Sequence, residues 1–115
     1  MSVTNALTRE CLHLLRLRGV LAWRNNTGAL TIARTNGRTQ FLRFGEVGSG
    51  DILAVMPQTG RFLSIEIKTG RDTLRQSQKE WIAQVRAQGG LAIVVRSLGD
   101  LCRFLDQQEK FNKVQ

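Results

Sequence analysis

The fold is decided by residues 51–68, which have the sequence DILAVMPQTGRFLSIEIK. Two apolar runs, residues 52–56 and 61–67, flank the segment Pro57-Gln58-Thr59-Gly60. Proline suits the first turn position and glycine suits a left-handed last position, so the pattern predicts a hairpin with a four-residue loop. Because both faces of these strands are largely apolar, we expect them at the centre of a sheet that is covered on each side.

The predicted hairpin brings two carboxylates together. If the loop is symmetric, Met56 pairs with Arg61, and the same register places Asp51 opposite Glu66. Cross-strand neighbours on one face have side chains about 5 Å apart, and like charges so placed destabilise a hairpin unless they are neutralised. Strand alternation puts Lys68 on the same face as Glu66. Two carboxylates and one ammonium group therefore converge at one strand end.

Carboxylate oxygens in this arrangement suit Mg²⁺ or Mn²⁺, which are commonly held by one or two carboxylates together with substrate phosphate. Such a metal would polarise a phosphoryl oxygen and activate water, and Lys68 would orient or help deprotonate that water. The pattern predicts phosphodiester hydrolysis with Asp51, Glu66 and Lys68 as catalytic residues. The alternative is an ordinary ion pair among Glu66, Lys68 and a neighbouring arginine.

The rest of the chain predicts a mixed sheet with helices packed against it, and its length suits a single domain over residues 1–115. Apolar spacing and turn signals define each further element. In chain order we expect a helix over 5–18, a strand over 20–23, strands over 30–34 and 40–44 around a turn at Asn36-Gly37, a helix over 74–88, a strand over 91–95, and a helix after Ser97 that fades into a polar tail at about 107–115.

Glu10 stands out within the first predicted helix. It follows Leu7 by three residues and precedes Leu14 by four, which places it on the apolar face of the helix. A carboxylate is unusual on a face that only packs against a sheet. Glu10 is therefore a candidate fourth member of the site.

The charge balance favours an anionic polymer as partner. The chain has 17 Lys and Arg residues against 9 Asp and Glu, a formal net charge of +8, and most of the basic residues are arginine, which suits phosphate recognition. The predicted hairpin at 30–44 is either a solvated edge or a phosphate-contacting ribbon, and the basic residues after the second central strand are either phosphate contacts or a solvated helix face. The candidate nucleic-acid-binding residues are Arg34, Arg38, Arg43, Arg71, Arg75 and Lys79.

Several other classes are excluded by simple features. No apolar run is long enough for a bilayer span and the N-terminus lacks a secretory signal, so we expect a cytoplasmic protein without a membrane partner. Cys11 and Cys102 have no zinc-ligand spacing and are expected to be packing residues. The glycines at 48–50 are not followed by Gly-Lys-Ser/Thr, so no nucleotide cofactor is expected. Trp23 and Trp81 lie within apolar patterns and are expected in the core.

The order of Asp51 and Glu66-Ile67-Lys68 resembles the D…ExK core of the PD-(D/E)XK nuclease superfamily, with Gly50 where the superfamily name has proline. More of the chain carries a narrower resemblance. Together with Glu10 in the first helix, four segments resemble the virus-type replication-repair nuclease (VRR-NUC) domain over nearly the whole chain: WRNNTG at 23–28, GEVGSGD at 45–51, EIKTGRD at 66–72 and QSQKEWI at 76–82.

The resemblance implies a restriction-endonuclease-like α/β fold with an α-β-β-β-α-β core. It also implies a metal held by Glu10, Asp51, Glu66 and the Ile67 carbonyl, with Lys68 catalytic and Gln78, or alternatively Gln76, supporting the site.

Stand-alone members are similar to Holliday-junction resolvases, which act as homodimers on branched DNA in phages and bacteria. The resemblance therefore implies a Mg²⁺-dependent endonuclease of DNA repair and recombination in a bacterial or phage-infected cell. The alternatives are a non-catalytic basic nucleic-acid-binding module, or a restriction-type, flap or exonuclease on the same core.

Overall fold

The computed structural model describes residues 2–114, with side chains through residue 112. Its elements follow in the order α1 (Val3–Leu17), β1 (Leu21–Arg24), β2 (Gly28–Ala33), β3 (Thr39–Phe44), β4 (Ile52–Val55), β5 (Phe62–Ile67), α2 (Gln76–Ala87), β6 (Leu91–Val95) and α3 (Leu98–Val114). The mixed α/β fold class predicted from the sequence is confirmed.

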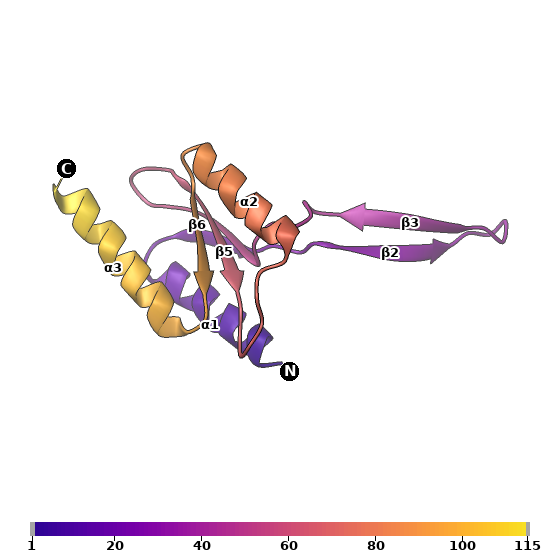
Figure 1. Cartoon of the computed structure of the whole chain (residues 1–115), viewed down its shortest axis with the longest axis horizontal. Coiled ribbons are helices and arrows are strands. Elements are labelled where there is room, and N and C mark those ends of the chain that lie inside the picture. Colours follow the sequence, from indigo (N-terminus) through magenta and orange to yellow (C-terminus); the bar gives the residue numbers. More distant parts are fainter. Residues whose placement is uncertain (1, 115) are drawn as a thin grey trace.

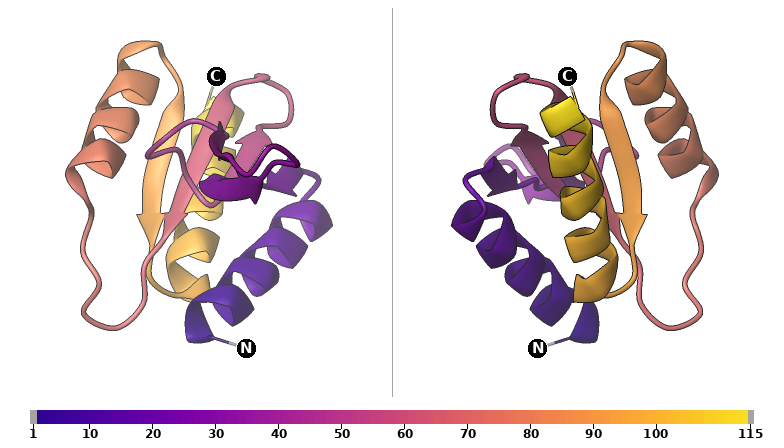
Figure 2. Two further views of the ribbon diagram at one scale, coloured as in Figure 1. Left: turned by 90° about the vertical axis from the view of Figure 1, so that its right-hand side faces the viewer. Right: turned by 90° about the vertical axis from the view of Figure 1, so that its left-hand side faces the viewer.

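Four strands form the central sheet in the order β1-β4-β5-β6. β4 runs antiparallel to both β1 and β5, whereas β5 and β6 are parallel and are joined through α2, as a parallel pair requires. One face of the sheet is covered by α2 and the other by α1 and α3 (Figure 1 and Figure 2). The two strands predicted to be central, β4 and β5, are indeed the inner strands.

The β4–β5 hairpin has the register that the sequence predicts. Ile52 pairs with Ile65, and beyond the strands the Met56 N–H donates a 2.9 Å hydrogen bond to the Arg61 carbonyl. Gly60 has a φ of 71°, in the left-handed region that favours glycine. The four-residue loop is therefore confirmed, and the register extends toward Asp51 and Glu66.

Alternation along β5 separates the hydrophobic core from the polar face. On one side, β5 packs into a core formed with α1 and α3, whose fully buried members include Leu15, Ile52, Leu63, Ile65 and Leu101. On the other side, Ser64 and Glu66 face α2, where Trp81 Nε1 donates a 2.8 Å hydrogen bond to Ser64 Oγ. Because side chains alternate between the two faces of a strand, Glu66 lies on the same face as Ser64, beneath α2.

β2 and β3 form a separate two-stranded sheet that projects from the body of the molecule (Figure 1). We call residues 28–44 the arm. The predicted turn is confirmed, because Gly37 has a φ of 80° and the Arg34 N–H donates a 2.8 Å hydrogen bond to the Arg38 carbonyl. The molecule is 62 Å long but only 31 and 25 Å across in the other directions. The sequence did not distinguish this arm from a part of the central sheet.

The structure differs from several local expectations, and the first helix and the first arm strand each begin two residues earlier than expected, at Val3 and Gly28. Trp23 is 42% exposed rather than buried, because β1 is an edge strand whose α2-side face is not covered by that helix. The helix expected from residue 74 begins at Gln76. Helix α3 runs to Val114, through the segment where a polar tail was expected. Among residues 2–114, no helix is long and apolar enough to cross a bilayer.

Candidate active site

Asp51 and the end of β5 are joined directly. Asp51 immediately precedes β4, and its Oδ2 accepts a 2.7 Å hydrogen bond from the Ile67 backbone N–H. Glu66 is the preceding residue on β5 and is only 6% exposed. The structure therefore brings the two carboxylates to the same strand end, where the hairpin register predicted them.

Lys68 follows β5 and extends its pairing with β6, since its N–H donates a 3.0 Å hydrogen bond to the Val95 carbonyl. Its side chain is buried, with Nζ 3.7 Å from Glu66 Oε1 and 3.5 Å from Asp72 Oδ2. A buried ammonium group needs such partners, because its desolvation is costly. Lys68 therefore lies within the carboxylate cluster, and Asp72 is an acidic neighbour that sequence reasoning missed.

The electrostatic environment of Glu66 is unusual. Burial raises the pKa of Glu66, and the nearby charge of Asp51 raises it further, while Lys68 lowers it; the result is a pKa of about 7. A carboxyl group with such a pKa binds a proton near neutral pH, and a cation between the two carboxylates would replace that proton. Repulsion between the carboxylates is the expected property of a site built to hold positive charge.

Gln78 contacts this site through the first turn of α2. Its Oε1 accepts a 2.9 Å hydrogen bond from the Arg75 N–H, which turns its amide nitrogen toward Glu66, and Nε2 donates a 2.8 Å hydrogen bond to Glu66 Oε1. Gln76 is exposed and instead donates to Glu80 on the helix surface. Of the two glutamines between which the sequence left the choice open, the structure brings Gln78 to the site.

The structure does not bring Glu10 to the site, which corrects the expectation for this residue. Glu10 is exposed on α1, whereas Thr8 is buried and Thr4 lines the cleft. Glu10 follows Thr8 by two residues, about 200° around the helix, and so points away from the cleft. At the cleft, Thr4 Oγ1 lies 2.6 Å from Thr69 Oγ1. Helix α1 thus contributes a hydroxyl group where a carboxylate was expected.

Asn25 positions the loop that precedes Asp51. Its side-chain amide donates hydrogen bonds of 2.7 Å to Ser49 Oγ and 2.9 Å to the Gly50 carbonyl. Its backbone N–H donates a 2.9 Å bond to the Asp51 carbonyl. Sequence reasoning did not assign this role, although Asn25 belongs to the WRNNTG segment and its partners belong to GEVGSGD. The WRNNTG and GEVGSGD segments are therefore joined by these hydrogen bonds into one structural feature.

A cleft of about 470 Å³ opens at the carboxylates, and the base of the arm forms one of its walls. Of the six basic residues proposed to bind DNA, Arg43 and Arg75 line this cleft. Arg34 and Arg38 lie at the far end of the arm, and Arg71 and Lys79 are exposed outside the cleft lining. The lining residues with polar side chains include Thr4, Thr27, Asp51, Glu66, Lys68, Asp72 and Gln78.

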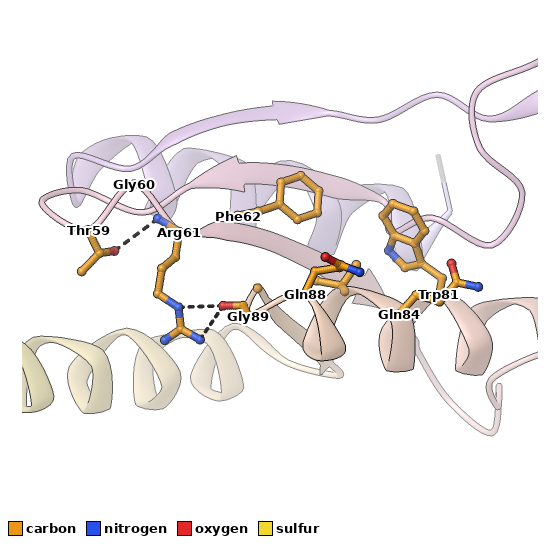
Figure 3. Close-up of a pocket in the computed structure, with 10 residues that line it drawn as sticks. Thr59, Gly60, Arg61, Phe62, Trp81, Gln84, Gln88 and Gly89 are labelled. Carbon is orange, nitrogen blue, oxygen red and sulfur yellow. Dashed lines mark hydrogen bonds between the residues drawn. The ribbon is translucent and has the colours of Figure 1, made fainter.

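A second cavity, of about 580 Å³, lies between α2 and the β4–β5 turn (Figure 3). Phe62 and Trp81 line it with their rings edge to face, 6.3 Å apart. Arg61 points its guanidinium group to the Gly89 carbonyl, as Figure 3 shows. Its lining contains no carboxylate, histidine or cysteine. This cavity therefore lacks the carboxylates that line the smaller cleft.

The cleft has donors that fit a hard divalent cation. Asp51, Glu66 and the Ile67 carbonyl supply oxygen atoms at one strand end, and Mg²⁺ is commonly held by one or two carboxylates with water and substrate phosphate completing its shell. No cluster of three or more Asp, Glu, His or Cys side chains suited to a metal occurs in the described part of the chain. The donor set therefore fits an open magnesium-type site and not a closed structural one.

Comparison with known proteins gives the family. A family model described as the VRR-NUC domain matches residues 5–99. The chain belongs to the VRR-NUC domain family. A solved structure described as a VRR_NUC domain shares 16% sequence identity, covers 92% of this chain and 97% of its own, and superposes with a TM-score of 0.66. A comparison with curated proteins finds no match. The VRR-NUC family is one of nucleases, so its match supports a nuclease role for the chain, and the likeness between the structures supports the restriction-endonuclease-like fold.

Proposed function

We propose that this VRR-NUC chain is a Mg²⁺- or Mn²⁺-dependent DNA endonuclease whose catalytic residues are Asp51, Glu66 and Lys68, with Gln78 supporting Glu66. The observation that carries the proposal is the buried cluster itself. Two carboxylates meet beside a 3% exposed lysine in a cleft that also contains two arginines. Burying such charges is costly, and stability alone gives little reason to retain them.

When bound by Asp51, Glu66 and the Ile67 carbonyl, the metal would polarise the scissile phosphate and lower the pKa of a water molecule. Lys68 would orient that water and offset the negative charge that develops on the phosphate oxygens. The water oxygen forms a bond to phosphorus, the bond to the leaving oxygen breaks, and the leaving oxygen takes a proton. Gln78 keeps Glu66 in position throughout.

The substrate is DNA, and the basic residues supply phosphate contacts. Arg43 and Arg75 at the cleft are the nearest to the reacting phosphate, with Arg71 and Lys79 on the adjoining surface. Resolution of four-way junctions is the specific activity proposed, within DNA repair and recombination. It requires two coordinated nicks, which a homodimer with one cleft in each subunit would make. Exposed Leu21 and Trp23 on the edge strand β1 are consistent with a subunit contact.

The test is an incubation of the purified chain with labelled four-way junction, flap and linear duplex DNA, in Mg²⁺ or in EDTA. We expect discrete symmetric nicks in the junction, in Mg²⁺ only. A ladder of products would favour an exonuclease, and cutting confined to flap or linear duplex would favour those alternatives. Binding without cleavage of any substrate would contradict the nuclease proposal and favour a binding module. A monomeric mass by light scattering at working concentration would argue against junction resolution.

A further inference from the structure

We propose that the arm, residues 28–44, is a DNA-binding ribbon that enters the major groove of the duplex flanking the cut, about six base pairs from the cleft. The inference rests on DNA being the substrate, as proposed above. It concerns a different part of the molecule from the catalytic cluster, because the arm extends away from the body along the long axis (Figure 1).

The arm is continuous with the cleft. Gly28 and Ala29 on its first strand, and Arg43 and Phe44 on its second, line the same cleft as Asp51 and Glu66, as does Thr27 just before the arm. Gly28 is paired with Phe44 at this base. A polymer with one phosphate at the carboxylates lies beside the base of the arm, and a polymer that continues in that direction runs along the arm.

The positive charge of the arm favours an anionic binding partner. Its basic residues are Arg34, Arg38 and Arg43, it contains no Asp or Glu, and no acidic residue occurs anywhere in residues 11–45. All three guanidinium-bearing residues are exposed, and none takes part in an ion pair within the structure of residues 2–114. Arginine side chains placed in this way are suited to phosphate contacts.

The shape of the arm fits a DNA groove. The major groove is about 12 Å wide and admits a two-stranded ribbon. At about 3.3 Å per residue, the six steps from Gly28 to Arg34 span about 20 Å, which corresponds to about six base pairs of a duplex. A lone two-stranded hairpin is marginally stable in water, so binding along its length would also stabilise it. Exposed Phe41 lies on the same face as Arg43, whose guanidinium carbon is 5.7 Å from the centre of its ring, and offers an apolar contact of the kind that thymine methyl groups make.

The alternative role for these arginines is to keep the exposed strand edges from pairing with other chains. Two variants distinguish the two roles. Arg34→Gln/Arg38→Gln removes two charges from the tip of the arm, and Arg103→Gln/Lys110→Gln removes two from exposed positions on α3, outside the cleft, where Arg103 forms an ion pair with Asp100. All four side chains are exposed, so both variants are expected to fold, which circular dichroism checks.

Binding is measured in EDTA, where the nuclease does not cut, on duplexes of increasing length and over a range of salt concentrations. On long duplex the tip variant should bind about tenfold more weakly, and its log–log salt slope should fall by about two, at about 0.9 for each lost phosphate contact. The α3 variant should remain within about twofold of the wild type. On duplexes too short to span both cleft and tip, the wild type and the tip variant should bind equally.

Equal affinity of the tip variant and wild type on long duplex, or an equal loss in the α3 variant, would overturn the inference. So would a loss of the same size on the shortest duplex, because it would place the contact at the cleft. Higher affinity for single-stranded DNA than for duplex DNA would exclude binding in the major groove. These outcomes are independent of cleavage: if the chain binds through the arm but never cuts, the nuclease proposal fails and the arm inference stands.

Discussion

Gln78 Nε2 on α2 donates a 2.8 Å hydrogen bond to Glu66 Oε1 on β5. The direction of this bond is fixed from the other side of the amide, because Gln78 Oε1 accepts from the Arg75 N–H at the start of the helix. One side chain therefore caps α2 and orients a buried carboxylate. The position of the helix and the geometry of the site are linked through Gln78.

The first prediction follows from this link. Gln78→Ala should lower the single-turnover cleavage rate about tenfold, since partners that orient a metal ligand typically contribute 10–100-fold. It should also lower the free energy of unfolding by about 1 kcal/mol through the lost cap. Gln76→Ala is the matched control, because Gln76 contacts only Glu80 on the exposed surface. A larger loss of activity in Gln76→Ala than in Gln78→Ala would show that Gln76, and not Gln78, supports the site.

The second prediction concerns pH. Glu66 has a pKa of about 7 in the folded protein against 4.5 ordinarily, so the folded state binds this proton more tightly than the unfolded chain does. The contribution of Glu66 to stability is therefore fully present below about 4.5 and is lost as the pH rises to about 7. In EDTA, the melting temperature of the wild type should fall over this range more than that of Glu66→Gln. Parallel pH profiles for the two proteins would contradict the assignment.

If the proposed metal site is correct, the same carboxyl group should make metal binding depend on pH. A divalent cation must displace the proton of Glu66, so its affinity should rise as the pH increases to about 7. Mn²⁺ added at pH 8 should raise the melting temperature of the wild type and leave that of Glu66→Gln nearly unchanged. Thermal unfolding with and without Mn²⁺ measures this, and an equal rise in both proteins would place the cation elsewhere.

The fourth prediction uses the close packing of Gly50 against β5. A Cβ at this position would lie 2.7 Å from the Ile65 carbonyl oxygen and closer still to Ser64 Oγ. Gly50→Ala should therefore cost about 1–3 kcal/mol of stability, because backbone must shift. Since Asp51 is the next residue, cleavage should also slow. Gly99→Ala on α3 is the control, where the nearest atom is the flexible end of the Arg103 side chain at 3.3 Å. Urea unfolding measures the stability of Gly50→Ala and Gly99→Ala. Equal stability of the two variants would contradict the close approach of Gly50 to β5.

The central hairpin was predictable because its signals are local. The Pro57–Gly60 loop determines the register, and the register determines that Asp51 faces Glu66, without any long-range information. Lys68 followed from strand alternation. The order of the remaining helices and strands could be inferred from apolar spacing, with errors of a few residues at their ends.

Other features depend on tertiary contacts that local patterns do not carry. The face of α1 toward the cleft includes Thr4 and Thr8, which hydropathy does not mark, so the apolar spacing assigned the wrong face to Glu10. The arm has ordinary strand alternation, and nothing local indicates that its strands pair only with each other. Asp72 lies in the irregular segment between β5 and α2, where spacing predicts no direction for a side chain.

The proposed cleavage of DNA depends on Asp51 and Lys68, and one comparison tests that directly. Single-turnover cleavage of labelled DNA in Mg²⁺ is measured for the wild type, Asp51→Asn, Lys68→Ala and Glu10→Gln, all purified in parallel. The wild type and Glu10→Gln should cut at similar rates, since Glu10 is exposed outside the cleft. Asp51→Asn and Lys68→Ala should lose more than about a hundredfold while still binding DNA. Cutting by either of these two at the wild-type rate would contradict the proposed site.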